Sequence, residues 1–385
     1  MRVENLRAFW FLSIAGSISL LPLLVLPAMI GVLVDESGLS EAFAGMSASA
    51  NFAGGASIAM LMAFRMHHID LRRATGVAFA VAAAMDVVSA FSTGSEALFL
   101  SARFAAGIGT GAAYTCIASA FARYANADRG YGVFVTLQFI ISGLGLYVLP
   151  VHASALGTEG MFLGIAGLEI LALLLLRHLP GKAIDLASPA SGRSEHGVLL
   201  APATILAVLS FGVFEAANTA QFTYIERLGV SIPLTEHHIG IALLVASLAG
   251  IPGAFITVLL GQRFGRVSPL TFGIALSVLG MLVLVSADGL LAYAIAGSCI
   301  GFAWAFCLPF IQGLLASLDA HGSAVAAGAS ASTIGGAAGP AVAASIVGNG
   351  QYHAVLLAAI GLLAVACAGF IVSNTQMRHT ALEVR

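Results

Sequence analysis

The sequence has few charged residues, and this scarcity excludes a soluble fold. Only 9% of its 385 residues are Asp, Glu, Lys or Arg, whereas 59% are hydrophobic. A soluble domain of this length must keep a wetted surface, and ordinary globular domains are about one quarter charged. Apolar runs of the ~20 residues needed to cross a bilayer recur along the whole chain. The sequence therefore predicts an integral membrane protein with little mass outside the lipid bilayer.

Other absences exclude further classes of function. A net charge of −2 leaves no basic surface for a nucleic-acid partner. The chain has no Gly-x-x-x-x-Gly-Lys-Ser/Thr phosphate loop, so ATP-driven transport by this chain is not supported. No nucleophile–base pair or metal cluster is visible, and we expect neither an enzyme nor a cofactor or metal. The cysteines lie inside apolar runs without ligand spacing and are expected to be small packing residues: Cys116, Cys299, Cys307 and Cys367.

The apolar runs predict an all-α protein with twelve transmembrane helices. Their connections are mostly short, as between antiparallel neighbours in a bundle. The first run is too long for the core of a signal peptide and lacks a convincing cleavage site, so it should remain as a span. The expected spans are 8–34, 41–64, 74–94, 97–121, 131–152, 157–178, 199–225, 238–262, 268–287, 290–316, 323–348 and 353–374.

One polar stretch rich in Pro, Ser and Gly, 180–196, divides these spans into two sets of six and is typical of a linker. The expected domains are an N-terminal bundle (1–178), a cytoplasmic linker (179–198), a C-terminal bundle (199–376) and a cytoplasmic tail (377–385). The halves also match each other at an offset of about 190 to 194 residues, which indicates a duplicated bundle. The matching positions are Gly107/Gly111 with Gly297/Gly301, Gly143/Gly145 with Gly335/Gly336, and Arg72/Arg73 with Arg266.

The distribution of basic residues predicts the orientation. If the N-terminus is cytoplasmic, all but two of the 16 Lys and Arg residues lie on the cytoplasmic side. The exceptions are Arg103, within a span, and Arg227, in an outer loop. Because cytoplasmic loops carry the excess of basic residues, we expect a multi-pass protein of the inner (plasma) membrane with both termini in the cytoplasm.

The stretch 100–114 contains Arg103 in an otherwise apolar span. A buried guanidinium is costly in hydrocarbon, so it should face a partner or a polar cavity. Gly107, Gly109 and Gly111 follow, and the first and last of these share a helix face that lets another helix approach closely. This Arg-x-x-x-Gly-x-Gly-x-Gly pattern resembles the fourth-helix signature of the major facilitator superfamily, a class of secondary transporters.

The resemblance extends to the loops and to two further helices. In the superfamily the loop after span two is thought to latch the inward gate through an Asp and a basic pair. Arg72 and Arg73 match that pair, but His68 stands at the Asp position, which makes such a latch doubtful here. The second copy of this loop keeps the basic and glycine positions as Arg263, Gly265 and Arg266. It has Gln at the position where the superfamily usually has Asp. Gly-rich segments ending in Pro150 and Pro340 resemble the antiporter signature, although a helix that merely bends is at least as good an interpretation.

The candidate site residues are the ionisable and polar groups deep in spans. The resemblance implies that spans one, four, seven and ten line a central cavity, so Arg103 and Glu215 are expected to face one substrate space. Asp86 and Glu169 lie on spans that are peripheral in this fold, and for Glu169 we favour a structural carboxyl that keeps its proton. The remaining candidates are Tyr114, Asn218, Gln221, Tyr224, Trp304 and Gln312.

The partner of Arg103 is open at this stage. Asp86 and Arg103 are equally far from the turn between their helices, so both lie ~13 Å below it at the helical rise. Equal depth makes Asp86 a possible ion-pair partner, but depth does not fix rotation about the helix axis. Glu215 or a water-filled cavity is a second possibility, and backbone carbonyls are a third.

The function predicted from these features is secondary active transport of a small organic compound by alternating access, as a monomer. Few fixed charges among many apolar and hydroxyl groups suit a modest-sized, partly apolar substrate. Proton-coupled export or exchange is the leading form. Uptake of an organic anion paired with Arg103 is an alternative, and a non-transporting receptor or scaffold on the same bundle is another.

Overall fold

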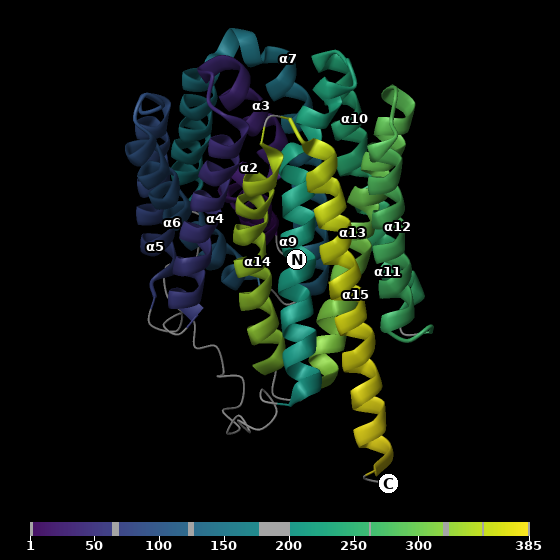
Figure 1. The fold of residues 1–385 in the computed structure, drawn as a ribbon. Coiled ribbons are helices and arrows are strands. Elements are labelled where there is room, and N and C mark those ends of the chain that lie inside the picture. Colours follow the sequence, from purple (N-terminus) through teal and green to yellow (C-terminus); the bar gives the residue numbers. More distant parts are fainter. Residues whose placement is uncertain are drawn as a thin grey trace. The chain divides into compact units, whose positions relative to one another are not determined.

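The computed structural model describes residues 3–63, 69–121, 127–176, 201–261, 263–318, 323–348 and 350–383. Within these residues the regular elements are helices, with no strand (Figure 1). In lipid a backbone must satisfy its own hydrogen bonds, and a helix does so within one segment. The prediction of an all-α membrane fold is therefore confirmed.

The first expected span is not one helix. The structure divides it into α1 (Val3–Ser19), α2 (Leu21–Leu24) and α3 (Leu26–Ser37). Pro22 and Pro27 occupy the first turns of α2 and α3. Because proline has no N–H and its ring displaces the preceding carbonyl, a continuous helix through both positions is disfavoured.

The next four helices provide five spans. They are α4 (Glu41–Ala63), α5 (Leu71–Ala90), α6 (Glu96–Phe121) and α7 (Ala127–Leu175), of which α7 contains two. Gly157 lies inside α7 with φ 60° and ψ −178°, a conformation open almost only to glycine. The break falls between the expected spans 131–152 and 157–178, and Pro150 lies within the helix before it.

The second half of the chain gives the remaining spans. Here α10 (Glu236–Leu248) and α11 (Gly250–Leu260) together form one span. The others are α9 (Pro202–Ser231), α12 (Val267–Val285), α13 (Leu290–Leu318), α14 (Ser323–Val347) and α15 (Tyr352–Glu383). Nine described helical segments are long and apolar enough to span a membrane, counting α7 once. The second span within α7, the broken first span and α4 complete the expected twelve.

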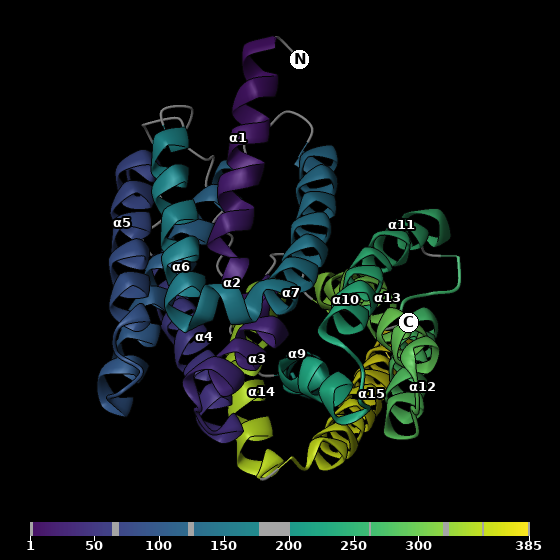
Figure 2. The same cartoon turned by 90° about the horizontal axis from the view of Figure 1, so that it is seen from above.

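The chain divides into two compact units, Met1–Ala187 and Ser188–Arg385. The expected linker lies in 177–200, outside the described residues, so its limits stay a prediction. Each unit uses the same kind of helix contact. In the first unit α6 packs beside α4, and in the second unit α13 packs beside α10 (Figure 2). Gly111 of α6 lies on the backbone of Gly55 in α4, and Gly301 of α13 lies on the backbone of Ala246 in α10. A side chain at either glycine would overlap the facing backbone.

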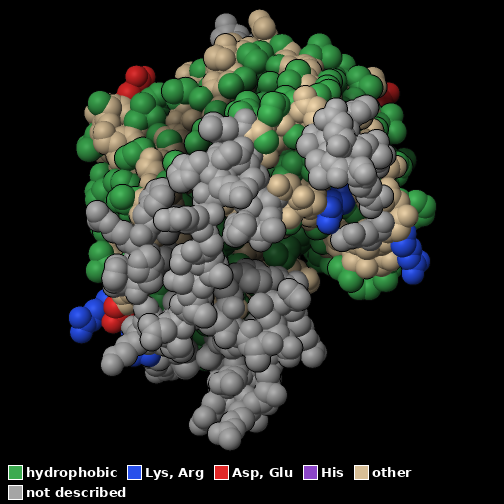
Figure 3. All heavy atoms as spheres, turned by 90° about the horizontal axis from the view of Figure 1, so that it is seen from below, with side chains coloured by type: hydrophobic (Ala, Val, Ile, Leu, Met, Phe, Trp, Pro, Cys, Tyr) green, Lys and Arg blue, Asp and Glu red, His purple; other side chains and the backbone are tan. Residues whose placement is uncertain are grey.

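The described surface carries large apolar side chains, as a membrane-spanning protein requires. Val258 is 76% exposed, Leu291 74% and Leu174 65%. Figure 3 shows mostly hydrophobic side chains on the described part of one end, with few charged groups. In water such a surface would drive aggregation, whereas in a bilayer it faces lipid chains.

Candidate functional site

Arg103 forms a buried ion pair with Asp86. One Nη of Arg103 donates to Oδ1 of Asp86 and lies 3.4 Å from the hydroxyl oxygen of Ser89. Arg103 on α6 is 2% exposed, and Asp86 on α5 is fully buried. The sequence left three possible partners for Arg103, and in the structure Arg103 pairs with Asp86. Pairing is what makes such charges tolerable in a low-dielectric interior.

Two further contacts hold Arg103 within the first unit, and a small cavity lies beside it. The ring of Phe162 on α7 has its centroid 4.9 Å from the guanidinium carbon, a cation–π contact. Asn51 on α4 donates from Nδ2 to the Arg103 carbonyl at 3.1 Å. A small cavity of about 20 Å³ beside Arg103, Asn51 and Ser47 has room for one water molecule. Helices α4, α5, α6 and α7 therefore meet at this arginine.

Glu169 on α7 is the third ionisable member of this site. It is fully buried and close enough to interact electrostatically with both Asp86 and Arg103. Apart from each other, Oδ2 of Asp86 and the carboxyl oxygens of Glu169 have no hydrogen-bond partner, and the two carboxyls are close enough to share a proton. One carboxylate neutralises Arg103, and a second buried carboxylate would leave an uncompensated charge. The electroneutral form of the cluster therefore carries one carboxyl proton. No pattern in the sequence joined Glu169 to this pair.

The three glycines after Arg103 fix how closely α6 is packed. Side chains added at Gly107 or Gly111 would overlap the backbone of Asn51 or Gly55 on α4. A side chain added at Gly109 would likewise overlap the backbone of Ala78 and Ala82 on α5. The expected close packing of the Gly107/Gly111 face is therefore present. The Gly109 contact brings α5 within reach of Arg103.

Glu215 is the ionisable group of a separate polar site in the second unit. It lies on α9, is 7% exposed, and accepts a long hydrogen bond of 3.5 Å from the indole Nε1 of Trp304 on α13. Among the described residues no cation lies within ion-pair distance of it. Its surroundings therefore differ from those of Asp86.

Two side-chain amides follow Glu215 along α9. Asn218 donates from Nδ2 to the Phe214 carbonyl at 2.8 Å, which leaves its Oδ1 as an acceptor without a partner. Gln221, one turn later, also has an unpartnered Oε1. Both residues are nearly buried, with 5% and 3% exposure. The site therefore presents two amide oxygens that no donor among the described residues satisfies.

The other candidate residues lie elsewhere. Tyr114 stacks on Phe134 of α7 with ring centroids 6.3 Å apart. Tyr224 packs against Tyr352 of α15 at 6.4 Å. Gln312 is exposed on α13, two turns beyond Trp304. The structure thus groups Glu215, Asn218 and Trp304, with Gln221 one turn further along α9.

The loop residues of the expected gate show a local ion pair. Asp70 caps α5 by accepting from the Arg73 backbone N–H at 3.0 Å, and its carboxylate lies 3.9 Å from Nε of Arg73. His68 lies outside the described residues. In the second unit Arg263 is exposed, whereas Arg266 is partly buried against Gly313. Pro150 and Pro340 lie inside α7 and α14.

Arg227 requires a correction. The sequence placed Arg227 in an outer loop, but α9 continues to Ser231 and encloses it. Its Nε donates to Oε2 of Glu226 at 2.7 Å, and each residue is 4% exposed. Tyr293 of α13 donates to the Ile225 carbonyl beside this pair at 2.7 Å. The apolar residues Leu228 and Val230 beyond the pair were the only sequence signal for a longer helix.

Comparisons with known proteins identify the fold. The family model described as Major Facilitator Superfamily matches residues 11–318. A solved structure of a mutant of the nucleoside transporter NupG has a TM-score of 0.81 and 13% identity, over 95% of this chain and 99% of that one. A D-xylose-proton symporter has a TM-score of 0.73 and 16% identity, over 96% of both chains. No curated protein sequence matches the chain.

Proposed function

Because the chain belongs to the Major Facilitator Superfamily, we propose that it is a proton-coupled secondary transporter that exports or exchanges a small organic compound by alternating access. The placement of all but two Lys and Arg residues on one side supports cytoplasmic termini and the inner membrane. The observation that carries the coupling is the environment of Glu215.

Glu215 is a buried carboxyl with no cationic partner among the described residues. An ionised carboxylate in such surroundings is costly unless a proton or a ligand compensates its charge. A proton and a substrate donor would occupy the same oxygen atoms and would therefore exclude each other. Mutually exclusive binding at one carboxyl is the simplest basis for exchanging a substrate for protons.

The neighbouring acceptors indicate the chemistry of the substrate. Asn218 and Gln221 each present an oxygen without a partner, and Glu215 presents two carboxyl oxygens beside them. A buried acceptor without a hydrogen bond costs free energy, so the bound substrate should supply N–H or O–H groups. An organic amine or a hydroxyl-rich compound meets this need, whereas an organic anion does not.

Uptake of an organic anion bound by Arg103 is less well supported. The guanidinium of Arg103 already forms an ion pair with Asp86, and Arg103 is only 2% exposed. An anionic substrate would have to displace Asp86 and strand its carboxylate in the interior, which is strongly unfavourable.

Transport in proteoliposomes tests this proposal. We would measure the uptake of uridine, xylose, a primary amine and a quaternary amine into the vesicles, with pH gradients imposed in both directions. Exchange predicts accumulation inside vesicles that are acidic within, because protons leave as the substrate enters. Accumulation driven by an acidic exterior would instead show symport, and no flux for the panel would favour a receptor or scaffold.

Two variants make the test specific for Glu215. Glu215→Gln keeps the shape of the side chain but cannot release a proton, so its transport should not respond to the pH gradient. Glu159→Gln removes an exposed carboxylate and should behave as wild type. If both variants respond to the gradient equally, Glu215 is not the coupling group.

A further inference from the structure

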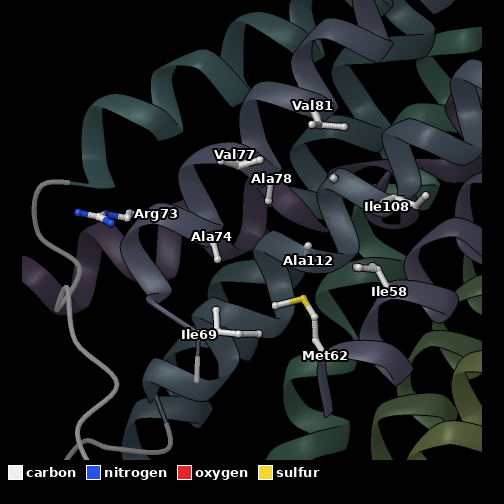
Figure 4. Close-up of a pocket in the computed structure, with 11 residues that line it drawn as sticks. Ile58, Met62, Ile69, Arg73, Ala74, Val77, Ala78, Val81, Ile108 and Ala112 are labelled. Carbon is white, nitrogen blue, oxygen red and sulfur yellow. The ribbon is translucent and has the colours of Figure 1, made fainter. Parts of the chain in front are cut away.

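A groove on the first unit is lined by apolar side chains and one arginine. It has a volume of about 450 Å³ and runs between α4 and α5. Both helices pack along α6, but few contacts join them to each other. Ile108, Gly109 and Ala112 of α6 form the floor (Figure 4). A channel is left open over Ala112, whose side chain is a single methyl group.

The occupant of this groove must be apolar and must come from the bilayer. Except for Arg73, the lining residues are aliphatic, Met or Gly. Val77 and Val81 on the α5 wall are 65% and 38% exposed. They lie on a helix that is long and apolar enough to span the membrane. Water in the groove would find no hydrogen-bond partner along most of its length.

Arg73 lies at the end of the groove at the start of α5, and its guanidinium points outward, away from the apolar lining (Figure 4). Its side chain is 88% exposed, and its contact with Asp70 is a long one of 3.9 Å between exposed groups. Such pairs contribute little and leave the guanidinium able to bind another anion. A second basic residue, Arg72, precedes it. A hydrocarbon channel ending at a basic residue is complementary to a lipid with an anionic headgroup.

We propose that this groove binds an anionic phospholipid, with one acyl chain along α6 and the phosphate at Arg73. The volume is within the range of about 300–1,000 Å³ typical of ligand sites. The proposal is independent of the transport function, because the groove lies on α4, α5 and α6 and includes neither Glu215 nor its neighbours.

Lipid association measured by electron paramagnetic resonance tests the site. The full chain is placed in phosphatidylcholine vesicles of low ionic strength with spin-labelled phosphatidylglycerol or spin-labelled phosphatidylcholine. The fraction of immobilised label gives the relative association of each lipid. We expect a preference for phosphatidylglycerol in wild type and about five-fold weaker association of that lipid in Arg73→Gln.

Matched controls separate this site from general surface effects. Arg263→Gln removes an exposed charge that does not line the groove and should keep the preference. Ala112→Leu should fill the floor and reduce immobilisation of both lipids, whereas Ala80→Leu, on the exposed side of α5, should not. An unchanged preference in Arg73→Gln, or an equal loss in Arg263→Gln, would overturn the proposal. Arg73 is exposed, so this result does not depend on whether Ala112→Leu folds.

Discussion

Replacing Asp86 by Asn tests whether the buried cluster holds the first unit together. The change keeps the size of the side chain but removes the negative charge that faces Arg103. Arg103 is 2% exposed, so its guanidinium has almost no contact with bulk water that could compensate the lost charge. The loss should therefore appear as lower stability of the whole unit.

The structure sets the expected magnitude. Removing one member of a buried ion pair costs about 3–5 kcal/mol. For domains of 150–250 residues, about 1 kcal/mol lowers Tm by about 2–4 °C, so the loss corresponds to about 6–20 °C. Glu169 interacts with the same arginine and can release its proton to replace Asp86. Asp86→Asn should therefore lie at the lower end of this range, and the double variant with Glu169→Gln at the upper end.

The measurement is thermal unfolding of the purified full chain in one detergent at one pH. Glu169→Gln alone should cost about 1 kcal/mol, as an average substitution does. The double variant should lose more than the two single losses combined, because neighbouring groups in one network are not additive. Glu159→Gln, an exposed change, should shift Tm by under about 2 °C. If Asp86→Asn also melts within about 2 °C of wild type, the pair does not stabilise the fold. Strict additivity would remove Glu169 from the cluster.

Further substitutions test the packing, the coupling and a buried hydrogen bond. Gly111→Leu forces a side chain into the α4 backbone and should cost at least about 1–3 kcal/mol in thermal unfolding, whereas Gly164→Leu, with open space around it, should be tolerated. Glu215→Gln should melt within a few degrees of wild type while its transport rate no longer changes with pH; a large loss of stability would indicate a structural carboxyl instead. Tyr293→Phe should cost about 0.5–1.5 kcal/mol by removing the hydrogen bond to the Ile225 carbonyl, and a neutral result in unfolding would show that this bond does not stabilise the chain.

The helices were predictable from the sequence because the bilayer dictates their length. A span must be apolar and about 20 residues long, so hydropathy alone locates it. The breaks in the first span were not predicted, although Pro22 and Pro27 are visible in the sequence. Proline is tolerated in membrane helices when neighbours satisfy the freed carbonyl groups, so its presence does not decide between a bend and a break.

The Arg103 site could be predicted from the sequence only as far as the depth of each residue along its helix determines which residues meet. The helical rise placed Asp86 and Arg103 at one level, and the structure pairs them. Rotation about the helix axes was missing from that argument. It depends on Gly109, which seats α6 on the backbone of Ala78 and Ala82. Glu169 was missed because it lies in the second span of α7, beyond the break at Gly157, and only tertiary packing brings it to Asp86 and Arg103.

The two ionisable sites differ in what a change of protonation would cost, and this difference favours Glu215 as the coupling group. Around Arg103, three helices contribute ionisable groups, and the cation is already compensated by one carboxylate, so opening the cluster leaves a buried cation or anion without a partner. Among the described residues, the side-chain hydrogen bond that Glu215 would lose is the long one from the Trp304 indole. A group that binds and releases a proton in every transport cycle must pass between two states of similar free energy. Glu215 meets that requirement with few contacts to break, whereas the Arg103 cluster is built to stay closed.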